Sequence, residues 1–214
     1  MGLLGRRAAG LDTALFVLLM LATGMFGGLL ETRTWEKTGV ILGVRLAGTD
    51  RSRVADAAAF LAIVVLTMAV YWLACLAIRA AGGPSRSTRE LAVAFAFSMI
   101  PLAAGFHLIH GVDHTVVDAQ RLLRLLSDPF GLGWNVLGTR MWPVVPINPR
   151  LMWGVQLTVI VAVHVAGVYV AHVRALTLYR DRRAAIRSQF PMVAAIVLFT
   201  VSGLWILTRI PMIL

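Results

Sequence analysis

Charged residues and cysteine are scarce in this chain of 214 residues. Asp, Glu, Lys and Arg together make up 14% of it, about half their usual share in a soluble domain, whereas hydrophobic residues make up 59%. Cys75 is the single cysteine, which excludes an internal disulfide, a cysteine-ligated iron–sulfur cluster and the CxxCH attachment of a c-type haem. Any redox centre held by this chain must therefore use other ligands.

Long apolar runs fill most of the chain. A helix needs about 20 apolar residues to cross the hydrocarbon core of a bilayer. Five runs meet this length: 12–30, 55–80, 91–114, 151–175 and 190–208. They leave one longer loop, 115–150, and no stretch large enough for a separate soluble domain. The sequence therefore predicts an all-α integral membrane protein, in which a single transmembrane domain of five helices covers residues 1–214.

Arginines gather at one set of helix ends. If the five helices alternate in direction, one side of the membrane receives Arg6, Arg7, Arg79, Arg86, Arg89, Arg174, Arg180, Arg182, Arg183 and Arg187. Because basic loops stay in the cytoplasm, we expect the N-terminus to be cytoplasmic and the C-terminus to lie outside. Attraction to anionic lipid explains the net charge of +10, so the lipid bilayer is the expected partner and nucleic acid is not.

The first part of the outer loop is amphipathic. In "TVVDAQRLLRLLSDPFG" (115–131), leucines alternate with arginines and aspartates. This segment either extends the third helix beyond the membrane or lies along the interface. Trp134 and Trp142 follow it, and both are expected at the depth of the lipid headgroups, where aromatic side chains are enriched.

Four polar side chains share one face of the third run. At 100° per residue, His107, His110 and His114 fall at about 0°, 300° and 340°, and Asp118 falls at about 20° if the helix continues. Ionisable residues inside a membrane are costly and are functional candidates by default. We refer to these residues as the histidine stripe. For Asp118, a surface ion pair with Arg121 or Arg124 is the alternative to a role as a ligand.

Two further histidines, His164 and His172, lie in the fourth run. At 1.5 Å per residue, His107 and His164 are at compatible depths, whereas His172 lies near the cytoplasmic end without a histidine partner. We therefore expect His172 to bond a neighbouring helix rather than to act as a ligand.

Three chemistries fit this arrangement. A haem b needs two axial histidines, which His107 or His110 together with His164 would supply. A copper or zinc ion would use His110 and His114, completed by His107 or Asp118. A proton path would use the same stripe without a metal.

Four blocks of sequence resemble a known family. They are "IPLAAGFHLIHGVDH", "LLSDPFGLGWNVLGT", "VQLTVIVAVHVAGVYVAHVRAL" and "SQFPMVAAIVLFTVSGLWIL". Over about residues 98–208 they resemble a bacterial family of polytopic membrane proteins, some of which carry the label fenitrothion hydrolase. Similar blocks occur in membrane proteins joined to polyferredoxin-type iron–sulfur modules. The sequence has no G-x-S-x-G nucleophile elbow to support the hydrolase label.

The resemblance implies a redox subunit in the bacterial cytoplasmic (inner) membrane. It implies that the five histidines are ligands, without naming the metal: His107, His110, His114, His164 and His172. We therefore expect a membrane-embedded electron-transfer subunit of a larger oxidoreductase or respiratory complex. In it, His107 or His110 with His164 holds a haem b and exchanges electrons with quinone, and loop 115–150 docks a redox protein on the outer face.

Two alternatives stay open. The first is a copper or other metal-ion site on the histidine stripe. The second is a non-redox transporter half or assembly scaffold, in which the histidines relay protons.

Overall fold

The computed structural model describes residues 10–38, 51–83, 86–145 and 148–209, without the side chains of 51–53, 113, 114 and 149. This part of the chain contains the long helices α1 (Leu11–Leu30), α3 (Arg51–Gly82), α4 (Thr88–Ser127), α5 (Pro149–Leu178) and α6 (Arg182–Arg209). Each of the five is long and apolar enough to cross a membrane. The prediction of an all-α membrane protein with five spanning helices is confirmed.

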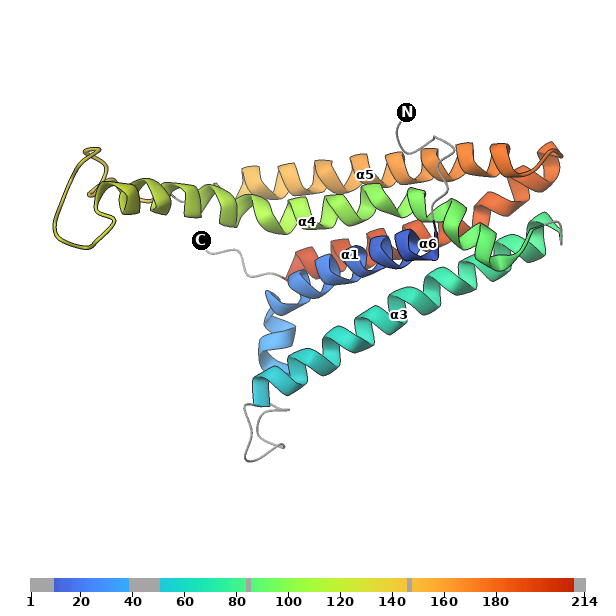
Figure 1. The fold of residues 1–214 in the computed structure, drawn as a ribbon, viewed down its shortest axis with the longest axis horizontal. Coiled ribbons are helices and arrows are strands. Elements are labelled where there is room, and N and C mark those ends of the chain that lie inside the picture. The colour runs from blue at the N-terminus through green and yellow to red at the C-terminus, as the bar shows by residue number, and fades with distance from the viewer. Residues whose placement is uncertain (1–9, 39–50, 84–85, 146–147, 210–214) are drawn as a thin grey trace.

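The helices form a ring of neighbours in which α1 packs on α4, α4 on α5, α5 on α6, α6 on α3 and α3 on α1. Successive helices run in opposite directions, so the bundle has two distinct ends (Figure 1). At one end lie the connections α3–α4 and α5–α6 with their arginines, and we call it the basic end. At the other end α4 runs on beyond its neighbours, and we call it the arm end (Figure 1). Which side of the membrane each end faces stays a prediction.

Local sequence signals explain where the helices start at the basic end. Ser87 and Glu90 form a capping box at the start of α4: Glu90 N donates to Ser87 Oγ (3.2 Å), and Ser87 N donates to the Glu90 carboxylate (3.0 Å). Asp181 accepts hydrogen bonds from the backbone N–H groups of Arg183 and Ala184 at the start of α6. These side chains satisfy N–H groups that the first helical turn leaves without a partner.

The basic end also holds a buried tyrosine between two helix ends. The ring of Tyr179 packs against Gly82, where a side chain would collide with it. Burial raises the pKa of this hydroxyl, and the positive charge of Arg86 opposes the rise only in part. Tyr179 therefore stays neutral at physiological pH and fills the joint between α3 and α5.

Glycines allow the helices to approach closely in the middle of the bundle. The side chain of Phe106 on α4 packs against Gly24 of α1 and Gly203 of α6, so it joins three helices. Between α4 and α5, Gly105 lies against Val163, and Gly167 lies against Leu102. Because lipid is as apolar as the helix surfaces, such close packing is a main source of helix association in membranes.

Helix α4 does not stop at the predicted boundary. It continues through residues 115–127, so the first part of the expected outer loop is helical, and the amphipathic segment extends the third spanning helix rather than forming a separate element. With 40 residues α4 is about 60 Å long, which exceeds the 40–45 Å of a bilayer with its headgroups.

Residues 128–145 fold back along this extension. Thr139 Oγ1 donates to the carbonyl of Leu123 (2.6 Å), and the Gln120 side chain bonds both N (2.8 Å) and O (3.1 Å) of Val145. The Asp128 carboxylate accepts from the N–H groups of Leu132 (2.9 Å) and Gly133 (3.0 Å). We call residues 115–145 the arm. Its polar groups bond inwards, whereas many large apolar side chains are exposed: Leu122, Leu123, Leu125, Leu126, Phe130, Leu132, Trp134, Val136, Leu137, Met141, Trp142 and Val145.

Candidate functional site

His107 and His110 lie in the seam between α4 and α1. The His107 Nε2 atom is 2.9 Å from the carbonyl oxygen of Met20 and 3.3 Å from Thr23 Oγ1. The Thr23 hydroxyl also donates to Met20 O (2.8 Å). Met20 O and Thr23 Oγ1 can therefore both accept from His107 when its Nε2 carries the hydrogen. A neutral His107 in this tautomer keeps the lone pair of Nδ1 for another partner.

His110 meets an acidic residue at the end of α1. Its Nδ1 atom lies 3.7 Å from the Glu31 carboxylate, and the two side chains are 14% and 33% exposed. The ring is pressed against Gly28, because a Cβ at that position would overlap Nε2 and Cε1 of the imidazole. Gly24 and Gly28 thus form a groove on α1 that receives Phe106 and His110. The sequence analysis missed Glu31, although an acidic residue directly after the first apolar run was a usable signal.

His107 and His110 face away from α5. On α4, Gly105 packs on Val163 of α5, and the carbonyl of Ile109 accepts a hydrogen bond from Gln156 of α5 (3.3 Å). At 100° per residue, His107 lies about 200° and His110 about 140° from Gly105 around the helix. The neighbour of these two histidines is therefore α1.

The two histidines of α5 face α6. His164 Nδ1 is 2.9 Å from Thr200 Oγ1, whose own hydroxyl donates to Ile196 O (2.8 Å), so the imidazole is the donor. His172 Nδ1 is 2.6 Å from Gln189 Oε1 near the basic end. Each histidine therefore connects α5 to α6.

The described histidines do not form the facing pair that the sequence led us to expect. His107 and His110 contact α1, whereas His164 contacts α6. The interface of α4 with α5 is closed by Gly105 on Val163. A haem b ligated by His164 and either stripe histidine would require α4 and α5 to separate, and the haem stays a prediction.

The remaining stripe residues lie toward the arm. Asp118 forms an ion pair with Arg121 (3.0 Å) on an exposed surface, which is the simpler of the two roles expected for it. The side chain of His114 lies outside the described residues, but its backbone position is one turn beyond His110 on the same helix. Among the described side chains, no group of three or more His, Cys, Asp or Glu residues could hold a metal ion.

Comparison with protein-family models, curated proteins and solved structures gave no match.

Proposed function

We propose that this chain is a multi-pass protein of the bacterial cytoplasmic membrane that binds a transition-metal ion in the α1–α4 seam. His110 and Glu31 provide two ligands, and His114, the next histidine of the stripe, is the candidate for a third, since His107 bonds Met20 O and Thr23 Oγ1 instead. The observation that carries this proposal is the approach of an imidazole and a carboxylate from two different helices, at 3.7 Å.

This distance suits a shared metal ion. Ligand atoms of His and Glu lie about 2.0–2.2 Å from a bound zinc ion. Two such ligands separated by about 110–125° at the metal are then roughly 3.4–3.7 Å apart. Imidazole suits zinc, copper and iron alike, so the chemistry of the pair does not choose among them.

A metal ion fits the seam better than a haem does. The ring of His110 already contacts α1 through Gly28, and Phe106 closes the seam one turn deeper. An ion needs only small side-chain movements here, whereas a porphyrin would displace a whole helix. The geometry therefore favours the first alternative from the sequence over the haem-bearing electron-transfer subunit.

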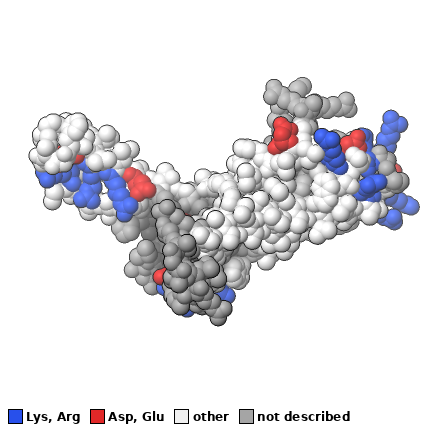
Figure 2. Space-filling model, turned by 60° about the horizontal axis from the view of Figure 1, so that its bottom comes forward, with Lys and Arg blue, Asp and Glu red and all other residues white. Residues whose placement is uncertain are grey.

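The arm supports a role within a larger complex. From Val112, where the apolar span of α4 ends, the helix continues for 15 residues, about 22 Å, to Ser127. Exposed apolar side chains on the arm lie beside Arg121, Arg124 and Arg140 (Figure 2). Since Asp118 and Asp128 pair with Arg121 and Arg140, we propose that a partner protein with a largely apolar surface covers this face of the arm on the outer side of the membrane.

The metal proposal is tested on detergent-purified protein, stripped with a chelator and titrated with Zn²⁺ or Cu⁺ while bound metal is counted by mass spectrometry. Glu31→Gln and His110→Ala should each weaken binding by tenfold or more, because each removes one ligand. His164→Ala is the matched control, because this histidine bonds Thr200 on the far side of α5.

Optical spectra of the same samples separate metal from haem. An α-band of reduced haem b that disappears in His164→Ala would contradict the proposal and support the haem-bearing electron-transfer subunit instead. The absence of stoichiometric metal from wild-type protein would also contradict it.

A further inference from the structure

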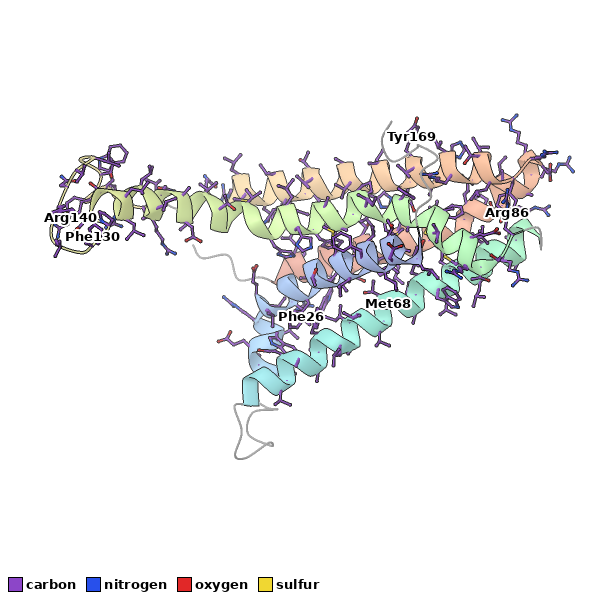
Figure 3. All side chains as sticks on the ribbon, in the orientation of Figure 1. Phe26, Met68, Arg86, Phe130, Arg140 and Tyr169 are labelled. Carbon is purple, nitrogen blue, oxygen red and sulfur yellow. The ribbon has the colours of Figure 1, made fainter. Side chains whose placement is uncertain are left out.

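A groove runs between α5 and α6 near the basic end, far along the bundle from the α1–α4 seam. Its volume is about 410 Å³, within the usual range of roughly 300–1,000 Å³ for small-molecule sites. Val165, Val168 and Tyr169 of α5 and Phe190 and Val193 of α6 line it. Tyr169 and Phe190 are 59% and 62% exposed, and Figure 3 shows Tyr169 directed away from the bundle. Inside a membrane, this groove opens to lipid.

The groove contains one polar pair, His172 and Gln189. His172 is six residues from the end of α5 and Gln189 seven residues from the start of α6, so both lie about 9–10 Å from that end of the helix pair. Arg182, Arg183 and Arg187 precede Gln189 on α6 and suit the headgroup layer. The polar pair therefore lies just below the headgroups.

The hydrogen bond within the pair determines what each side chain still offers. His172 Nδ1 is 2.6 Å from Gln189 Oε1, so the ring nitrogen donates and the amide oxygen accepts. A neutral His172 then has a lone pair on Nε2, and the amide nitrogen of Gln189 has its N–H donors. The site thus combines one acceptor with one donor on an apolar, partly aromatic background.

We infer that this groove binds the ring of a lipid-soluble hydroquinone. One ring hydroxyl donates to His172 Nε2, the amide of Gln189 donates to a ring oxygen, and the ring packs between Tyr169 and Phe190. An acyl chain in the same place would offer no partner to His172 Nε2 or to the amide N–H groups of Gln189, at a cost of about 1–3 kcal/mol for each unsatisfied group. The inference does not depend on the metal site, because α1 and Glu31 take no part in it.

The matched control is the second polar contact between the same two helices. His164 also connects α5 to α6, through Thr200 (2.9 Å), but it does not line the groove. If His172 and Gln189 only hold the helices together, variants at His172 and His164 should behave alike. If they bind a ligand, only the His172 and Gln189 variants should lose binding.

The probe is 2-heptyl-4-hydroxyquinoline N-oxide, a fluorescent ring compound of quinol shape, titrated into the full chain in lipid nanodiscs. Wild-type protein should quench its fluorescence with saturation at one site per chain. His172→Ala and Gln189→Ala should weaken binding about tenfold or more, and His164→Ala should leave it within a factor of two. Decylubiquinol should displace the probe, whereas 1-decanol should not.

Val165→Trp provides a second variant that keeps the polar pair intact. Val165 is exposed (61%) on the groove wall, so a larger ring there should fill the groove and abolish binding without disturbing the core. Thermal unfolding of every variant identifies any loss of fold. Absence of saturable binding, equal loss in His164→Ala and His172→Ala, or displacement by 1-decanol would each overturn the inference.

Discussion

Gly28 is the position where the smallest change should separate helix packing from metal binding. In the Gly28→Ala variant, the new Cβ would overlap Nε2 and Cε1 of His110 and would lie 2.9 Å from Cγ2 of Ile206. Carbon atoms need about 3.5–4.0 Å, so the imidazole must move by about 1 Å or more. That movement takes His110 out of its present 3.7 Å approach to Glu31.

The magnitude follows from three contributions. Overpacking a well-filled interface costs about 1–3 kcal/mol, and turning His110 away from its rotamer costs about 0.5–1.5 kcal/mol if the ring moves instead. Replacing glycine by alanine inside a helix stabilises the helix by about 1 kcal/mol, which offsets part of this loss. We expect the free energy of unfolding to fall by about 1 kcal/mol, and metal affinity to fall 10–100-fold, the usual effect of misorienting a ligand.

Gly27→Ala is the control, because among the described residues no atom outside the neighbouring turns of α1 lies within 4 Å of a Cβ at this adjacent position. It changes helix propensity in the same way but leaves His110 undisturbed, so its metal affinity should stay within a factor of about two or three of wild type. Both variants are compared by metal titration and by thermal unfolding in detergent. If Gly28→Ala bound metal as tightly as Gly27→Ala, the proposed site at His110 would be refuted.

Three further predictions concern the fold and the arm. Tyr71→Phe removes the buried hydrogen bond to Ala92 O (2.6 Å) and should lower the free energy of unfolding by about 1–3 kcal/mol, as measured by chemical denaturation; an unchanged midpoint would show that this bond is dispensable. Ser87→Ala removes the capping box of α4 and should cost about 1 kcal/mol in the same assay, with no effect expected on metal binding. Asp128→Ala removes two backbone hydrogen bonds of the arm and should speed proteolysis at 128–145, whereas Asp118→Ala on its surface should not; equal cleavage rates would argue against Asp128 as the organiser of the arm.

The membrane class and the five helices followed from the sequence because apolar length is a local property. The course of α4 beyond residue 114 did not, because the pattern of Leu122 to Leu126 with Arg121 and Arg124 fits a projecting helix and an interfacial helix equally well. The structure distinguishes the two because α4 is continuous from Thr88 to Ser127. In addition, Thr139 and Val145 of the returning chain bond Leu123 and Gln120 of this extension.

The histidine stripe was predictable as a shared face, but its neighbour was not. A helical wheel orders His107 and His110 relative to one another and carries no information about which helix they meet. That choice depends on glycines in two other helices: Gly24 and Gly28 admit α4 on one side, and Gly167 admits it on the other. The role of Glu31 depends in turn on that pairing, so the sequence alone did not reveal it.

One uninterrupted helix carries both the histidine stripe and the helical part of the arm (115–127), so it connects the proposed metal site to the proposed docking surface. An imidazole lies about 5–6 Å from the helix axis, so a rotation of α4 by about 20° at the arm would move it by roughly 2 Å. A protein that turns the arm would therefore change metal affinity in the seam. Thermodynamic linkage requires the reverse effect to be equal: occupancy of the seam would change the affinity for that protein by the same factor. In such a molecule, the presence or absence of metal in the seam would change partner binding at a surface some 20 Å beyond the apolar span.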